Sequence, residues 1–241
     1  MTASEAAATP TRSATVVIPW RPQPSRLDAF DRVLAWYAEN LPDIDVRTID
    51  SDDPVFNLAR CRNLAFDLAD GDVLIINDAD TLPERDALLR AIDGAATTRA
   101  VHLPYDEYRW FGAQGSAQYA AGVAAADCAF ELVHGACSGV YVATAETWRA
   151  HGGQDERFRG WGFEDAAWYI AHSTMLDTPP IRIPGRVYAL HHVAAERSGT
   201  QYEANAALMQ RYRDASGDRE ALGQLLADSV SARNALVAPG S

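Results

Sequence analysis

Apolar positions along the chain alternate between short β-forming runs and longer segments with helical spacing. In the first half, apolar runs rich in Val and Ile predict strands at residues 14–19, 44–49 and 72–77. Between and after them, apolar residues recur with a period near 3.6, which predicts helices at 26–40, at 57–68 and from Pro83 or Glu84 to about Asp93. Strands that alternate with helices form parallel sheets with right-handed crossovers, so the pattern predicts an α/β fold.

The second half of the chain is less regular. A strand is expected at 99–103, whereas the stretch 104–134, rich in Ala, Gly, Tyr and Gln, predicts no definite element. The remaining pattern predicts strands at 136–143 and 186–190, the last of them in the core, and helices at 145–151, 163–172, 202–213 and 219–234. Because no linker or repeat divides the chain, we expect one domain at 14–235, between a disordered leader at 1–13 and a tail at 236–241.

Composition narrows the possible partners. The chain has 241 residues, of which 48% are hydrophobic, and its net charge is −12. Nucleic acid is therefore not expected as a partner, and a small anionic substrate fits better. Three cysteines without metal-ligand spacing favour a reducing compartment, and no apolar run has the length of a membrane span, so we expect a cytoplasmic protein. The Ala-rich, Lys-poor composition suggests a high-GC genome, and the expected compact form without a membrane anchor fits a bacterial or phage protein.

Two carboxylates follow the most apolar strand. The run from Val73 to Asn77 is followed by Asp78-Ala-Asp80, at the sheet edge where open α/β sheets bind ligands. Residues i and i+2 of an extended segment point to the same side, so Asp78 and Asp80 are able to share a divalent cation, which in turn can bridge a diphosphate. The motif alone leaves open an exposed turn before Thr81.

Several motifs, taken in chain order, resemble the GT-A-fold glycosyltransferases, in a form similar to glycosyltransferase family 2. The C-terminal motif is most similar to the segment shared by β-1,4-galactosyltransferases and polypeptide N-acetylgalactosaminyltransferases. The motifs are Pro19-Trp-Arg21, Phe56-Asn-Leu-Ala-Arg60-Cys-Arg62-Asn63, Asn77-Asp-Ala-Asp80, and Gly152-Gly153 followed by Gly160-Trp-Gly-Phe-Glu164-Asp165. The resemblance covers about residues 14–195. It implies a mostly parallel, Rossmann-like central sheet, with a nucleotide-binding half at 14–103, an acceptor and catalytic half at 104–195, and C-terminal helices at 196–235.

The resemblance implies a metal site. Asp80, with Asp78 directly or through water or ribose, would hold Mn²⁺ or Mg²⁺ against the diphosphate of a nucleotide-sugar, expected to be a UDP-sugar, and the metal would offset the charge of the leaving nucleotide. A histidine after a late strand usually completes such a site, and His191 or His192 stands at that place. The sequence leaves the choice between them open, since a single histidine is more often structural than functional.

The segment Gly160 to Asp165 carries the candidate catalytic chemistry. Glycines let the backbone approach a sugar, the indole of Trp161 offers an apolar face, and two acids at a helix start accept hydroxyl hydrogen bonds. The resemblance implies that Asp165 is the general base of an inverting transfer and that Glu164 orients hydroxyl groups. The alternative is that these acids only cap a helix while Trp161 packs in the core.

The expected nucleotide contacts come from strand ends and from the next helix. They are Pro19, Trp20, Arg21, Asp50, Asp52, Arg60, Arg62, Asn63, Asp78 and Trp161. For Arg60 and Arg62, a solvated helix face is an equal alternative. The chain departs from the galactosyltransferase pattern at Phe163 and at Ala166-Ala167, so the donor and acceptor preferences stay open.

These features predict a metal-dependent glycosyltransferase that moves a sugar to an acceptor hydroxyl of a glycan, a protein or a small molecule. Three alternatives stand beside it: a retaining transferase similar to the polypeptide N-acetylgalactosaminyltransferases, a catalytically silent module that binds nucleotide-sugars, and, more distantly, a nucleotidyltransferase. The combination of Asp78, Asp80, Glu164 and Asp165 in one chain favours the enzyme, because a silent module needs neither a metal pair nor a base.

Overall fold

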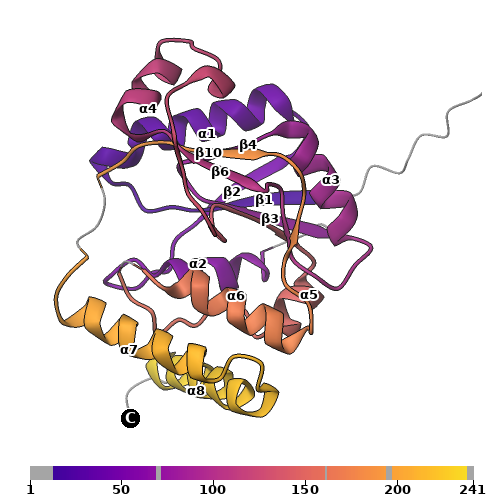
Figure 1. The fold of residues 1–241 in the computed structure, drawn as a ribbon, viewed down its shortest axis with the longest axis vertical. Helices are drawn as coiled ribbons and strands as arrows, with labels where there is room; N and C mark the ends of the chain where they lie inside the picture. Colours follow the sequence, from indigo (N-terminus) through magenta and orange to yellow (C-terminus); the bar gives the residue numbers. More distant parts are fainter. Residues whose placement is uncertain (1–12, 69–71, 161, 194–196, 238–241) are drawn as a thin grey trace, which may run out of the picture.

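The computed structural model describes residues 13–68, 72–160, 162–193 and 197–237, and its elements follow the predicted α/β order (Figure 1). The helices are α1 (Leu27–Asn40), α2 (Leu58–Ala65), α3 (Arg85–Ala95), α4 (Gly112–Ala120), α5 (Ala145–Ala150), α6 (Glu164–Met175), α7 (Thr200–Asp214) and α8 (Arg219–Val237), with 3₁₀ turns η1 (Pro24–Arg26) and η2 (Ala125–Asp127). The strands are β1 (Ala14–Pro19), β2 (Asp45–Ile49), β3 (Val73–Asn77), β4 (Thr81–Pro83), β5 (His102–Leu103), β6 (Glu107–Trp110), β7 (Glu131–Leu132), β8 (Val140–Ala143), β9 (Ile181–Arg182) and β10 (Arg186–Ala189). The predicted leader falls almost wholly outside the described residues, as does most of the predicted tail.

The central sheet has the strand order β2-β1-β3-β8-β5-β9 within the described residues. Strand β1 pairs in parallel with both β2 and β3, and Val16 lies between Val46 and Ile75. Strand β8 is antiparallel to both of its neighbours, β3 and β5, so it alone runs against the common direction. The predicted mostly parallel sheet is therefore confirmed, and the carboxyl ends of β1, β2 and β3 meet at one edge.

A second sheet, with the order β4-β10-β6-β7 in the described part of the chain, lies beside the first. The strand expected in the core at 186–190 exists as β10, and its Val187 and Tyr188 are buried in the main apolar core. It belongs to this second sheet and not to the central one. Strand β10 pairs antiparallel with β4 and parallel with β6. Both partners are short and carry no clear period-2 pattern, which is why the sequence did not reveal the second sheet.

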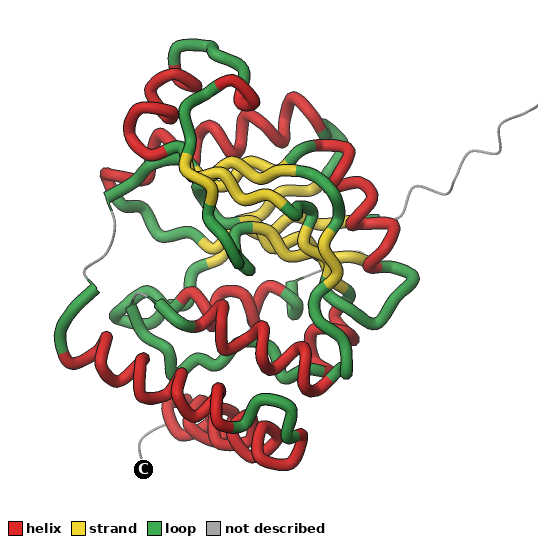
Figure 2. The backbone as a smooth tube through the Cα atoms, viewed as in Figure 1, coloured by secondary structure: helices red, strands yellow, loops and turns green. Residues whose placement is uncertain are grey.

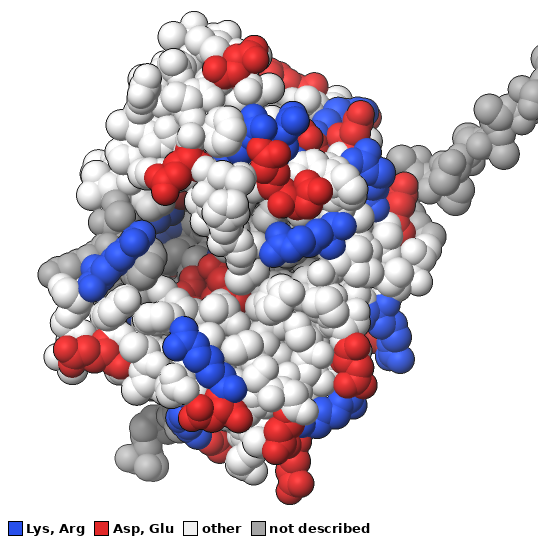
Figure 3. Space-filling view, viewed as in Figure 1, with Lys and Arg blue, Asp and Glu red and all other residues white. Residues whose placement is uncertain are grey.

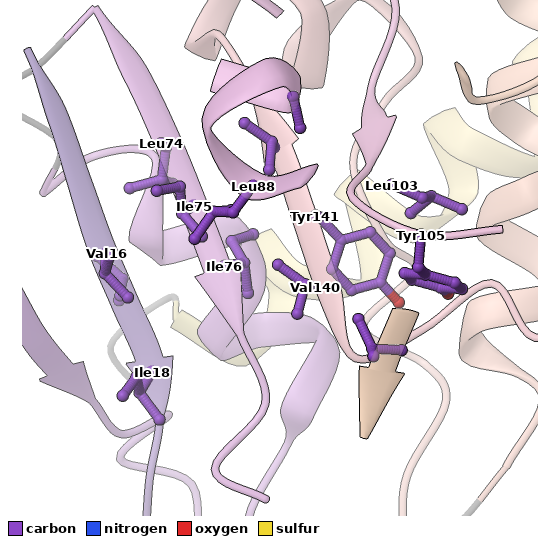
Figure 4. Packing of buried hydrophobic residues seen from close by; sticks show 14 of the residues in the cluster. Val16, Ile18, Leu74, Ile75, Ile76, Leu88, Leu103, Tyr105, Val140 and Tyr141 are labelled. Atoms are coloured by element: carbon purple, nitrogen blue, oxygen red, sulfur yellow. The ribbon is translucent and has the colours of Figure 1, made fainter. Parts of the chain in front are cut away.

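Helices cover the sheets on two sides, as Figure 2 shows. Helices α1 and α3 lie on one side, and α2, α5 and α6 lie on the other, with α7 and α8 packed outside α6 (Figure 1). The Val, Ile and Leu side chains of β1 and β3 are buried between these layers, and Leu88 of α3 lies against β3 (Figure 4). A smaller apolar cluster joins α6 to α7 and α8 and includes Phe158, Met209, Tyr212 and Leu222.

The surface agrees with the acidic composition. On the face shown in Figure 3, arginine and acidic side chains are interspersed, and no continuous basic patch is visible. None of the helices in the described residues is both long and apolar enough to cross a membrane. The cytoplasmic location stays a prediction.

Candidate active site

A tight turn at the end of β3 separates the two carboxylates of the Asp78-Ala-Asp80 motif. Buried Asn77 builds this turn, because its amide nitrogen donates to the carbonyls of Asp78 at 2.8 Å and Thr81 at 2.9 Å. The chain therefore leaves the extended conformation at residues 79 and 80. Asp78 and Asp80 consequently meet different cationic partners, whereas a continued strand would have turned both to one side.

Asp78 faces a buried arginine. Both of its carboxylate oxygens accept from Nη2 of Arg62, at 2.8 and 3.0 Å, and the Arg62 side chain is 0% exposed. The Nη1 atom of Arg62 donates to Oδ1 of Asp165 at 2.6 Å and to Gln154 at 3.0 Å. Tyr141 lies under the guanidinium and also donates its hydroxyl to Asp165. Burial raises the pKa of Asp78, and the charge of Arg62 opposes that rise.

Asp80 faces the end of the first βα connection and the segment after β10. Its Oδ2 atom accepts from Nη1 of Arg26 at 2.9 Å and lies 3.0 Å from Nε2 of His192. The hydrogen bond to Asp80 raises the pKa of His192. His191 points elsewhere: its ring lies 6.3 Å from that of Trp110, and its backbone N–H donates to Ser116. Of the two histidines that the sequence left open, the structure thus brings His192 to the motif.

The two acids of the C-terminal motif open helix α6. Phe163 precedes them with a φ of 77°, a left-handed conformation that is unusual for a residue with a side chain. Burial, followed by the nearby charge of Asp165, raises the pKa of Glu164 to about 8. Asn205 of α7 steadies this loop, since its amide donates to the carbonyl of Arg159 at 2.7 Å. Trp161, the expected sugar platform, lies outside the described residues.

The carboxyl ends of β1 and β2, where nucleoside contacts are predicted, carry a pair of opposite charges. Arg21 donates to both oxygens of Asp50, at 2.8 and 2.6 Å, and this contact lowers the pKa of Asp50. Asp52 follows with a φ of 56° and donates its backbone N–H to Asp50. The predicted neighbours Pro19 and Trp20 are held by the strands, because Pro19 pairs with Ile49 and the Trp20 N–H donates to the same residue.

The polar side chains of helix α2 make contacts within the protein. Arg62 is fully buried, so the solvated-face interpretation was wrong for it: α2 packs beneath β1 and β3 and directs this side chain inward. Asn63 donates to the carbonyl of Gln154 and to Glu156, and its oxygen accepts from Trp148, so both ends of its amide are engaged within the protein. Arg60 lies 3.9 Å from Glu156. The side chains of Arg62 and Asn63 are thus engaged within the protein, and nucleotide contact by these α2 residues stays a prediction.

Three residues of this site escaped the sequence analysis: Arg26, Tyr141 and Gln154. Each lies outside the recognised motifs and reaches the site only through tertiary packing. For Arg26 a signal existed, since it opens the helix after the first strand, where α/β folds commonly contact ligands. Within the described residues, no three His, Cys, Asp or Glu side chains gather closely enough to hold a metal by themselves.

No protein-family model matches the sequence, and no curated protein sequence matches it either. Solved structures do share the fold. The chain is similar to Drosophila β1,4-galactosyltransferase 7 in complex with manganese, UDP-Gal and xylobiose, with a TM-score of 0.54, 16% identity, and coverage of 80% of this chain and 78% of that one. The chain has a GT-A fold.

A second similar structure is GalNAc-T7 with UDP, GalNAc and Mn²⁺. Here the TM-score is 0.57 and the identity 12%, and the match covers 90% of this chain and 54% of the other. This chain therefore spans about half of that protein. At such low identity the two similarities confirm the predicted GT-A fold, and the chemistry has to be argued from the site.

Proposed function

We propose that this protein is a metal-dependent glycosyltransferase that transfers a sugar from a nucleoside diphosphate sugar, expected to be a UDP-sugar, to an acceptor hydroxyl. One observation carries the proposal: buried Arg62 joins the Asp78-Ala-Asp80 turn to the acids that open α6. A candidate metal-binding group and a candidate base thus share one site at the carboxyl edge of a GT-A sheet. The two similar structures contain Mn²⁺ together with UDP-Gal or UDP, which supports this interpretation.

Asp80 and His192 are the residues that would hold Mn²⁺ or Mg²⁺. Their oxygen and imidazole nitrogen lie 3.0 Å apart, and both are ligand types that Mn²⁺ accepts. Two protein ligands leave coordination positions for diphosphate oxygens, which fits a metal that binds together with its nucleotide. When bound, the metal would offset the charge that builds on the leaving nucleotide. Asp78 is already paired with Arg62, and this pair would hold the turn that carries Asp80 in place.

Asp165 is the proposed general base. Arg62 and Tyr141 both donate to Oδ1 of its carboxylate, so the group has a fixed orientation. In the transfer, the acceptor oxygen forms a bond to the anomeric carbon as the bond to the diphosphate breaks, and the acceptor proton passes to Asp165. A single displacement of this kind inverts the anomeric configuration.

Glu164 has a different proposed role. Because burial raises its pKa to about 8, its carboxyl holds a proton near neutral pH. A protonated carboxyl donates one hydrogen bond and accepts others. Glu164 is therefore suited to orient sugar hydroxyl groups. The sequence indicated only that it accepts hydrogen bonds from them, and the protonated carboxyl would also donate one.

The proposal is tested by screening UDP-, GDP-, dTDP- and CMP-sugars for slow hydrolysis in the presence of Mn²⁺, with and without chelator. We expect hydrolysis of a UDP-sugar that stops in chelator and in Asp80→Ala. Binding of UDP without hydrolysis of any sugar donor would favour the silent module. Full turnover in excess chelator would contradict the metal's role.

A further inference from the structure

Arg26 stands at the candidate metal site, and no motif predicted it there. We propose that Arg26 binds the donor diphosphate, and that before the nucleotide binds it competes with the divalent cation for Asp80. This inference rests on the proposed function. It extends that function by naming the side chain that neutralises the phosphate charge and controls binding of the metal.

The competition follows from the contacts of a single oxygen. Oδ2 of Asp80 accepts from Nη1 of Arg26 at 2.9 Å and lies 3.0 Å from Nε2 of His192. The side chain of Asp80 is only 11% exposed, so few other approaches to its carboxylate exist. A cation that binds Asp80 through Oδ2 meets the positive charge of the guanidinium at the same oxygen, and this repulsion favours displacement of Arg26.

After displacement, the backbone keeps Arg26 close to the site. The N–H of Arg26 donates to the carbonyl of Gln23 at 2.9 Å, in the 3₁₀ turn that leads into α1. Earlier in the same connection, Trp20 stacks on Phe30 of α1, with ring centroids 4.0 Å apart. The side chain of Arg26 is 30% exposed, so its guanidinium can turn toward solvent when Asp80 binds the metal. The guanidinium therefore moves only within the reach of one side chain and stays beside the metal.

A diphosphate is the ligand that fits a guanidinium at this place. The donors of arginine form a planar fork that matches two phosphate oxygens. The neighbouring arginines are engaged elsewhere: Arg62 with Asp78 and Asp165, and Arg21 with Asp50. Arg26, whose partner is the residue that the metal would take, is the arginine that metal binding releases.

The inference predicts that the metal and the nucleotide bind cooperatively. Without nucleotide, the metal must break the Arg26–Asp80 pair, and the released guanidinium gains no compensating contact. With nucleotide present, the released guanidinium gains phosphate oxygens, so each ligand improves the binding of the other.

The test compares Arg26→Ala with Arg32→Ala, a control in the helix that follows Arg26, whose side chain lies over the ring of Tyr119. Mn²⁺ binding without nucleotide is measured by electron paramagnetic resonance, and UDP binding at saturating Mn²⁺ by calorimetry. For Arg26→Ala we expect Mn²⁺ affinity to rise roughly threefold, as for loss of a weak ion pair, and UDP affinity to fall about tenfold or more. The control should change neither affinity by more than about twofold.

A further variant separates charge from geometry. Arg26→Lys keeps the charge but loses the planar fork, so its UDP affinity should lie between those of the wild type and Arg26→Ala. Circular dichroism confirms that each variant is folded. Unchanged Mn²⁺ or UDP affinity in a folded Arg26→Ala protein overturns the inference and leaves the proposed function standing. If the wild type itself binds no UDP with Mn²⁺, both fail.

Discussion

Arg62 and Asp165 lie 103 residues apart in the sequence, yet Nη1 of Arg62 donates to Oδ1 of Asp165 across 2.6 Å. The same guanidinium binds Asp78. A buried cation thus separates two carboxylates that would otherwise repel each other, and it fixes the distance between the candidate metal-binding turn and the candidate base. The two halves of the site depend on one side chain.

Replacing Arg62 with Met should therefore destabilise the protein strongly. The variant leaves Asp78 and Asp165 without their buried counter-charge, which typically costs about 3–5 kcal/mol of unfolding free energy. Urea denaturation measures the change. The control is Arg99→Met, since Arg99 is 79% exposed in its pair with Glu146, and it should stay within about 0.5 kcal/mol of the wild type. A loss below about 1 kcal/mol for Arg62→Met would show that the pair is not structural.

The two adjacent histidines should behave differently. In wild-type protein with Mn²⁺, UDP should raise the melting temperature by an amount that grows with UDP concentration. His192→Ala should lose most of this metal-dependent rise, because His192 lies 3.0 Å from Asp80, whereas His191→Ala should keep it. Thermal shift assays with and without chelator measure both. Equal behaviour of the two variants would contradict the assignment of His192 to the metal.

Asp165→Asn should separate turnover from donor binding. The amide keeps the size of the side chain but accepts no proton, so kcat should fall by roughly 10²–10⁴-fold while UDP affinity changes little. Some stability should also be lost, since Arg62 loses one of its two carboxylate partners. NMR of the product gives a separate check: retention of the anomeric configuration would remove Asp165 from the role of base.

The raised pKa of Glu164 predicts that its effect on the stability of the protein depends on pH. Its pKa is raised to about 8 in the folded protein and is roughly 4.3 in an unfolded chain. Between these values the folded state binds more protons, so stability falls as the pH rises through this window. Glu164→Gln removes the effect, and its melting temperature relative to the wild type should climb from about pH 4.3 to about pH 8. The exposed Glu203→Gln should show no such trend.

Buried His151 predicts sensitivity to acid. Its ring is 0% exposed, neither ring nitrogen has a hydrogen-bond partner within the described residues, and burial lowers its pKa to about 3. The unfolded chain takes up a proton near pH 6.5, so stability falls as the pH drops from about 6.5 toward 3. His151→Phe, which keeps an aromatic ring beside Trp148 and Trp168, should lose less stability in acid. The exposed His134→Phe should match the wild type at every pH.

The sequence determined the features that depend on local spacing. The apolar runs at 14–19 and 72–77 became the buried strands β1 and β3, because a strand buried on both faces needs apolar side chains at every position. A parallel sheet aligns the carboxyl ends of its strands, so the sequence also placed Asp78, Asp80, Arg21 and Asp50 at one edge. The GT-A fold was predicted from the resemblance that the motifs of the chain bear to that family.

Only the tertiary structure decided which side chains meet. Arg26 and Asp80 are 54 residues apart, and Arg62 and Asp165 are 103 apart. Such pairs leave no local period, because they depend on how α1, α2 and α6 pack around the sheets. The same holds for the choice of His192 over His191, which was fixed by the path of the chain after β10, and for the membership of β10 in the second sheet. Periodicity records how each segment faces the core, whereas the contacts of the site depend on which segments the core brings together.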